Sequence, residues 1–209
     1  DCIQWITAPW IAATNALMNH PGVSLVLATG GSGMVRAAYS TGKPALGVGP
    51  GNVPCYIEKT ARLERACTDL MLSKTFDNGM ICASEQAVIV DEEIADEFER
   101  IMKANNCYFL QGEEIEKVSR FVINPQTQAV NPDVVGKPAC WIAEQSGIQV
   151  PDKTKILIAP LEDVGPQYPL SREKLSPVLA YFTVKGHGEG FAMAKKMLEL
   201  GGLGHSAVI

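Results

Sequence analysis

The chain has 209 residues, of which 46% are hydrophobic and 20% are charged, and its formal net charge at pH 7 is −5. These are the proportions of an ordinary globular protein with a sizeable core, arranged as one large or two small domains. An acidic chain without a run of Lys or Arg lacks the surface that nucleic acids require, so we expect no nucleic-acid partner.

Hydrophobic runs alternate with helical patterns along the chain, and this alternation predicts an α/β fold with a largely parallel sheet. Strands are predicted at 2–6, 25–29, 45–48, 53–58, 87–90, 155–159 and 178–184. Helices are predicted at 9–19, 34–39, 60–74, 91–104, 115–121, 139–146 and 189–200. Asp91 is expected to cap the helix that follows it, with Glu92 and Glu93 in the first turn.

The six cysteines are irregularly spaced and contain no Cys-x-x-Cys pair, which favours reduced thiols in a cytoplasmic protein over a disulfide framework or a metal site. No apolar stretch approaches the roughly 20 residues of a membrane helix, so we expect no membrane partner. The chain opens without an initiator Met and stops inside the apolar run 207–209. We therefore expect a piece of a longer protein.

Cys82 is the candidate nucleophile, because it follows a glycine-containing turn, Asp77-Asn78-Gly79, just before an apolar strand. A thiol held in this way can attack a substrate, whereas a buried thiol is inert. Burial is the alternative for Cys82, and it is our prediction for the other five cysteines. Cys55 lies in a predicted strand, and Cys67 lies on the apolar face of a predicted helix.

Two glycine-rich segments are candidate ligand contacts. Ala28–Met34 places Gly30, Gly31 and Gly33 between a strand and a helix, where backbone N–H groups can approach a phosphate or a ring closely. These glycines do not complete a dinucleotide fingerprint, and Gly42-Lys43-Pro44 is not a phosphate loop. From the pattern alone, a plain turn explains Ala28–Met34 equally well, and a bend between strands explains the second segment, Gly47–Asn52.

Together, Ala28–Met34, Gly42–Asn52 and Phe76–Gln86 resemble the CoA-acylating branch of the aldehyde dehydrogenase superfamily, and in particular the aldehyde dehydrogenase half of the bifunctional aldehyde-alcohol dehydrogenases of fermenting bacteria. The similarity runs along nearly the whole chain. It implies an α/β, aldehyde dehydrogenase-like fold. Residues 1–52 would be the second part of a Rossmann-like NAD-binding domain, and residues 53–209 would be a catalytic domain that is incomplete at its C-terminus.

The resemblance also assigns roles to single residues. It makes Cys82 the catalytic cysteine, and it makes Glu173, by its spacing to Pro177, the glutamate that hydrogen-bonds the nicotinamide ribose. Without the family, an exposed residue of a charged loop is the better interpretation of Glu173. The further cofactor contacts that the resemblance implies are Thr29, Gly30, Gly31, Ser32 and Gly49.

His205 lies in Gly204-His205-Ser206, which resembles a Gly-His-Thr step of the CoA-acylating branch. An imidazole titrates near neutral pH, so His205 could shuttle protons for the aldehyde or for the CoA thiol. The alternative is a partly buried histidine whose ring is satisfied by the backbone.

The acyl acceptor is predicted from a missing carboxylate. The hydrolytic aldehyde dehydrogenases carry a glutamate that activates water, and counting back from the family proline, matched by Pro54, places that position at Val48. Because valine cannot take a proton, the thioester on Cys82 should wait for a thiol, and coenzyme A is the expected co-substrate.

The activity implied by the resemblance is NAD-dependent interconversion of acetyl-CoA and acetaldehyde in fermentative ethanol metabolism. The partners would be a small aldehyde and CoA, in a homo-oligomer that forms filaments in the full-length protein. A stand-alone acetaldehyde or propionaldehyde dehydrogenase of the same branch, or a fragment that serves only in assembly, are the alternatives.

Overall fold

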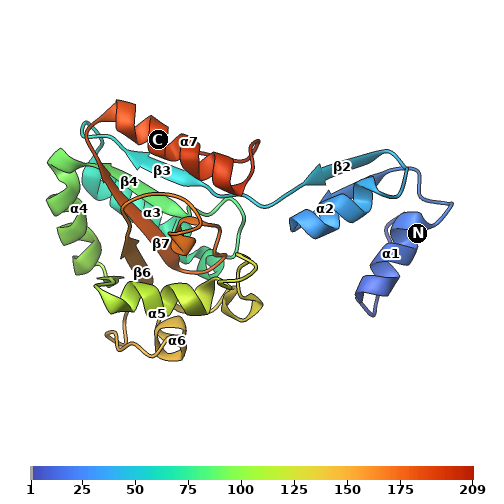
Figure 1. Ribbon diagram of the computed structural model, residues 1–209, viewed down its shortest axis with the longest axis horizontal. Coiled ribbons are helices and arrows are strands. Elements are labelled where there is room, and N and C mark those ends of the chain that lie inside the picture. Colours follow the sequence, from blue (N-terminus) through green and yellow to red (C-terminus); the bar gives the residue numbers. More distant parts are fainter. Residues whose placement is uncertain (1) are drawn as a thin grey trace. The chain divides into compact units, whose positions relative to one another are not determined.

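The computed structural model describes residues 2–209. The chain separates into two compact units, one ending at Pro50 and the other running over Gly51–Ile209 (Figure 1). The boundary predicted from the sequence lies two residues later. The assignment of the two parts as cofactor and catalytic domains stays a prediction.

The first unit is a short βαβ arrangement. Its elements are α1 (Ile11–Asn19), β1 (Val26–Thr29), α2 (Ser32–Tyr39) and β2 (Ala45–Val48). β1 and β2 pair in parallel, and a Cβ atom at Gly47 would come within 2.6 Å of Val35 on α2, so helix and sheet meet where only glycine fits. The strand predicted at 2–6 is wrong: residues 2–10 form neither strand nor helix, because none of the described strands pairs with them.

The second unit is a five-stranded sheet with helices on both faces (Figure 1). In chain order its elements are β3 (Pro54–Ile57), α3 (Leu63–Thr75), β4 (Ala87–Asp91), α4 (Glu92–Ala104), β5 (Cys107–Phe109), α5 (Glu113–Val122), α6 (Ala139–Gln145), β6 (Ile156–Pro160), β7 (Val178–Val184) and α7 (His187–Gly201). The strand order is β3-β4-β7-β6-β5. All pairs are parallel, which confirms the predicted largely parallel sheet. β5 escaped prediction because three residues are too few to show a period.

Alternate residues of each strand enter different cores. Ile156 and Ile158 pack with α3 and α4 on one face, whereas Leu157 and Ala159 pack with α5 and α6 on the other. α7 covers the same second face over β3, β4 and β7. Burial on both faces explains why these strands appear in the sequence as unbroken apolar runs.

Parallel pairing gathers four loops at one edge of the sheet. The segments before β3, β4 and β7 all enter the sheet at its amino edge, because neighbouring parallel strands start on the same side. Val208 pairs in parallel with Cys55 of β3, so His205 approaches the same edge. Cys82 precedes β4 and Glu173 precedes β7, and the fold therefore brings both loops to one edge.

Asp91 ends β4 just before α4, but its side chain does not cap the helix as predicted. Its carboxylate instead accepts hydrogen bonds from the Tyr56 hydroxyl at 2.8 Å and from the Lys59 N–H at 3.0 Å. Asp91 is buried, so these donors from the neighbouring strand satisfy a carboxylate that is out of reach of water.

None of the helices in residues 2–209 has the length and apolar character that crossing a membrane requires.

Replacing Tyr56 by Phe should lower the free energy of unfolding by about 1.5–3 kcal/mol, because the buried Asp91 carboxylate loses a charge-assisted donor while the ring packing is kept. Urea unfolding measures this loss. Tyr108→Phe is the matched control, since the Tyr108 hydroxyl donates to a less buried carboxylate, that of Glu114, at 3.0 Å. Equal losses in the two variants would contradict the role assigned to the buried pair.

Candidate active site

Cys82 lies on an exposed turn between α3 and β4, as the sequence predicts. The turn begins with three successive left-handed residues, Asp77 (φ 49°), Asn78 (φ 50°) and Gly79 (φ 70°). A Cβ atom at Gly79 would lie 2.8 Å from the Ser176 carbonyl oxygen, so both space and backbone conformation require glycine there. The turn thus sits directly on the loop that follows Glu173.

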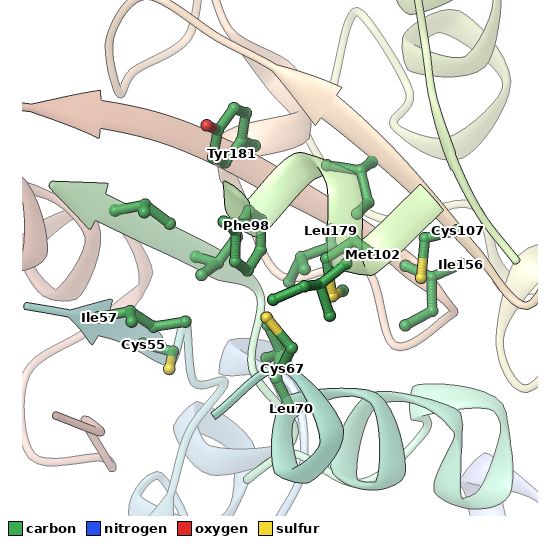
Figure 2. Close-up of a cluster of buried hydrophobic side chains, with 14 of the residues drawn as sticks. Cys55, Ile57, Cys67, Leu70, Phe98, Met102, Cys107, Ile156, Leu179 and Tyr181 are labelled. Carbon is green, nitrogen blue, oxygen red and sulfur yellow. The ribbon is translucent and has the colours of Figure 1, made fainter. Parts of the chain in front are cut away.

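The other cysteines fall into two groups. Cys55, Cys67 and Cys107 are buried in the core between the sheet, α3 and α4 (Figure 2). Burial raises their pKa values to about 12, 11 and 12, which makes them inert thiols. The prediction that all five other cysteines are packing residues is wrong for Cys2, which is exposed, and only partly right for Cys140. Cys140 is half-buried, and its thiol faces the backbone carbonyl of Thr154 at 3.4 Å.

Glu173 is partly buried rather than an exposed residue of a charged loop. Its Oε1 atom accepts a hydrogen bond of 3.2 Å from the Gly51 N–H. Burial raises the pKa of the Glu173 carboxyl, and the Gly51 hydrogen bond and the charges of His205, Lys174 and Lys74 oppose that rise. The carboxylate is fixed in place yet keeps one oxygen for a ligand.

His205 is half-buried and packs against the same glycine. A Cβ atom at Gly51 would lie 2.9 Å from the imidazole ring, so Gly51 is what allows His205 and Glu173 to converge. The Nδ1 atom of His205 accepts a hydrogen bond of 2.8 Å from the Ser206 N–H. This agrees with the backbone-satisfied alternative for one ring nitrogen and leaves Nε2 as the atom that could exchange a proton.

No hydrogen bond within residues 2–209 joins the Cys82 thiol to Glu173 or His205. The loops are tied together one step away, where the Lys174 N–H donates to the Gln86 side chain at 2.9 Å and the Lys174 ammonium donates to the Gln86 carbonyl at 2.9 Å. Lys174 is completely buried. The residue after Glu173 is therefore bound to the strand entry that follows Cys82.

Asn52 is a positioning residue that the sequence did not single out. It is buried, and its amide donates to the Ser171 and Met197 carbonyls, both at 2.9 Å. A Cβ atom at Gly201 would lie 2.2 Å from the Asn52 Cβ, so α7 is pressed against this side chain. The signal available in the sequence was an Asn directly after a glycine-rich bend and before an apolar strand.

Lys74, at the end of α3, was also missed. It lies four residues after Leu70 and seven after Cys67, so its helical spacing places it on the buried face of α3, and that spacing was the available signal. It is fully buried, and its Nζ atom has no hydrogen-bond partner among residues 2–209. Burial lowers the pKa of Lys74 to about 7, against the opposing effects of the Glu85 and Glu173 charges. A buried lysine that titrates near neutrality beside an exposed thiol turn is typical of a functional region.

The predicted cofactor contacts of the first unit lie where β1 turns into α2. Gly31 precedes the helix, no side chain caps its free N–H groups, and a Cβ atom at Gly31 or Gly33 would meet nothing within 4 Å. Thr29, Gly30 and Ser32 flank this open turn. A Cβ atom at Gly49 would also meet nothing within 4 Å, and Val48 is 50% exposed at the end of β2.

Comparison with known proteins decides the family. The model of the aldehyde dehydrogenase family matches residues 1–131, which is more than half of the chain. The chain belongs to the aldehyde dehydrogenase family. The described residues hold no group of three or more His, Cys, Asp or Glu placed to bind a metal, and the exposed thiol of Cys82 is the group at this edge that suits covalent aldehyde chemistry.

The chain is similar to aldehyde dehydrogenases both in sequence and in structure. The aldehyde-alcohol dehydrogenase of Streptococcus pneumoniae (strain TIGR4) is 52% identical over 216 residues, covering 100% of this chain and 24% of that protein. An acetylating aldehyde dehydrogenase from Geobacillus thermoglucosidasius superposes with a TM-score of 0.92 at 50% identity, covering 97% of this chain and 44% of that one. A Rhodopseudomonas palustris propionaldehyde dehydrogenase with bound propionyl-CoA superposes with a TM-score of 0.81 at 32% identity, covering 90% and 41%. The chain spans about a quarter of the length of the first of these relatives.

Replacing Lys74 by Met should raise the melting temperature most near pH 7 and least near pH 10. Below pH 7 the lysine is charged in both the folded and the unfolded chain, so the folded chain bears the full cost of the buried charge. Between a folded pKa of about 7 and the ordinary lysine pKa of 10.5, the folded chain loses the Lys74 proton while the unfolded chain keeps it, so wild-type stability rises with pH across this window.

Melting curves of Lys74→Met and wild type across this pH range measure the effect. Lys195→Met is the control, since Lys195 has an exposed side chain (75%). A pH-independent difference between Lys74→Met and wild type would contradict the lowered pKa.

Proposed function

We propose that these residues carry the catalytic cysteine of a CoA-acylating aldehyde dehydrogenase that interconverts acetyl-CoA and acetaldehyde with NAD. The observation that carries the proposal is the exposed Cys82 turn at the sheet edge where Gly51 brings Glu173 and His205 together. The names of the relatives support the reaction class, because they include an aldehyde-alcohol dehydrogenase and an acetylating aldehyde dehydrogenase.

The reaction runs through a covalent intermediate on Cys82. The thiolate sulfur forms a bond to the aldehyde carbon, the carbonyl electron pair moves to oxygen, and protonation gives a thiohemiacetal. Loss of a hydride from the carbon and of the proton from oxygen restores the C=O bond and leaves a thioester. His205 is the proposed acceptor of this proton through Nε2, since its Nδ1 atom is engaged with the Ser206 N–H.

Each unit, taken by itself, carries residues that fit part of a nicotinamide nucleotide, which accepts the hydride when it is bound. The uncapped N-terminus of α2 beyond Gly30 and Gly31 suits a phosphate or a polar ring edge, because free N–H groups and the positive end of the helix dipole lie there. Glu173 offers a carboxylate oxygen for the two hydroxyls of a ribose, and charge-assisted hydrogen bonds of this kind are the strong ones. NAD rather than NADP is the finer part of the proposal.

Coenzyme A is the proposed acyl acceptor because the position of the hydrolytic glutamate carries Val48. The CoA thiol loses its proton and attacks the thioester carbon, and the Cys82 thiolate leaves, so the enzyme is regenerated. The Rhodopseudomonas palustris relative, solved with bound propionyl-CoA, supports an acyl-CoA ligand. On the resemblance alone, we also propose a cytoplasmic homo-oligomer for the full-length protein.

Replacing Cys82 by Ala in the full-length enzyme should abolish NADH formation from acetaldehyde and CoA, because no other group at this edge can form the thioester. Cys67→Ala is the control. That thiol is buried and inert, so the variant should lose stability and keep its turnover. Substantial activity in Cys82→Ala would contradict the covalent mechanism on Cys82.

Replacing Val48 by Glu should raise CoA-independent formation of acetic acid, because general-base assistance to water contributes about 10²–10⁴ in rate. Wild type should give little sustained NADH from acetaldehyde until CoA is added. Val48→Gln is the control, since it has nearly the shape of Glu and no basic carboxylate. Rapid CoA-independent turnover of wild type would contradict the CoA-acylating assignment and favour a hydrolytic aldehyde dehydrogenase.

A further inference from the structure

The turn before Cys82 is built from the three residue types that best tolerate left-handed backbone. Asp77 and Asn78 adopt φ values of 49° and 50°, and Gly79 follows at 70°. Left-handed backbone is costly for most side chains, whereas Gly adopts it freely and Asn and Asp visit it at low cost. The Asp-Asn-Gly triplet therefore explains the shape of the turn, but it does not explain in which direction the turn points.

A hydrogen bond from a distant segment supplies that direction. The Asn78 side-chain amide donates to the Gly136 carbonyl at 3.0 Å, across 58 residues of sequence. The Gly136 N–H in turn donates to the Leu175 carbonyl at 3.0 Å. Gly136 (φ 68°) and Leu175 (φ 46°) are themselves left-handed, so three unusual backbone positions are joined by two consecutive hydrogen bonds.

Gly136 is held between the two functional loops. A Cβ atom on Gly136 would lie 3.4 Å from the sulfur of Met80, on the Cys82 turn. Leu175 belongs to the loop that carries Glu173, two residues earlier. Gly136 therefore connects the loop that carries Cys82 to the loop that carries Glu173. The Asn78 amide is the hydrogen-bond donor on the Cys82 side.

The packing of Gly79 on Ser176 cannot replace this bond. A Cβ atom at Gly79 would lie only 2.8 Å from the Ser176 carbonyl oxygen, so the turn already rests closely on Ser176, but a steric contact leaves the turn free to tilt away. A hydrogen bond is directional and fixes both distance and angle. The turn is also closed locally at both ends, because the Met80 N–H donates to the Asp77 carbonyl at 3.2 Å and the Ser84 N–H donates to the Ile81 carbonyl at 2.9 Å. We therefore treat the five residues from Asn78 to Cys82 as one piece.

We propose that Asn78 is a positioning residue, whose hydrogen bond to the Gly136 carbonyl aims the Cys82 thiol at the aldehyde carbon. The Asn78 amide is engaged with the Gly136 carbonyl, so its proposed action is through the orientation of the turn. The inference rests on the proposed role of Cys82 as nucleophile. Small errors in the placement of a reacting atom are costly in rate, because the bond forms only from a narrow range of approach.

Two substitutions separate the amide from the backbone in the full-length enzyme. Asn78→Asp keeps the shape and the tolerance of left-handed backbone but removes the donor. Asn78→Gly keeps the backbone freedom and removes the side chain altogether. In both, the NADH burst from acetaldehyde and NAD without CoA should slow by about 2- to 10-fold, the range of one neutral hydrogen bond, while the Kd for NAD is unchanged.

Alkylation by iodoacetamide distinguishes misdirected attack from a general disruption of the turn, because disruption would change the access of any reagent to the thiol. This small reagent attacks the thiol from any direction, so the labelling rate of Cys82 should stay within about twofold of wild type in both variants. Cys2, which is also exposed, is the internal reference in the same peptide map. A slow burst with normal labelling is the signature of misdirected attack.

Asn131→Asp is the matched control. The Asn131 amide also donates to a backbone carbonyl, that of Phe121, at 3.0 Å in a half-buried site, and Asp keeps the Asn131 Oδ1 contact with the Asp133 N–H. Asn131→Asp should lose comparable stability and keep the wild-type burst rate.

The inference is overturned by a wild-type burst rate in Asn78→Gly, by an equal slowing in Asn131→Asp, or by alkylation that falls in parallel with the burst. Retained turnover in Cys82→Ala would instead overturn the proposed function, so the two failures are distinguishable.

Discussion

The ammonium group of Lys174 holds the functional edge of the sheet together. It is completely buried and donates to three backbone carbonyls, those of Gln86, Leu170 and Arg172, at 2.9, 2.7 and 2.6 Å. Burial lowers the pKa of Lys174, yet three carbonyls at these distances are what the three donors of an ammonium group require. Through this one side chain, the strand entry after Cys82 and the loop around Glu173 become a single rigid piece.

A polar layer surrounds that ammonium beneath the thiol turn. Asn52 binds the Ser171 and Met197 carbonyls, and Lys74 lies fully buried at the end of the helix that leads into the turn. Lys74 and Lys174 also repel each other, which adds to the effect of burial on Lys174. Such an arrangement costs stability, because buried charges are poorly compensated outside water. These polar groups lie next to the loops of the proposed active site, where a loss of stability can be offset by a gain in function.

Glycine at two positions makes the convergence of the loops sterically feasible. Gly51 leaves room for the His205 ring, and Gly79 lets the turn rest on Ser176. Each neighbour comes from a segment remote in sequence. Substituting either glycine would push apart loops that the parallel sheet has brought to one edge. At Gly136 the backbone conformation (φ 68°), rather than space, favours glycine.

The sequence by itself determined the α/β class, most strands and helices, the family and the candidate nucleophile, because buried parallel strands and the motif around Cys82 are local signals. Only the tertiary structure decided that Asp91 binds Tyr56 and Lys59 instead of capping a helix, that Glu173 and His205 meet at Gly51, and that the buried Lys74 ammonium has no hydrogen-bond partner among residues 2–209. It also decided the partner of Asn78, since Gly136 is 58 residues away. Periodicity reports which face of an element is apolar, but a hydrogen bond between loops depends on where strand order and crossover place them, and no local pattern records that.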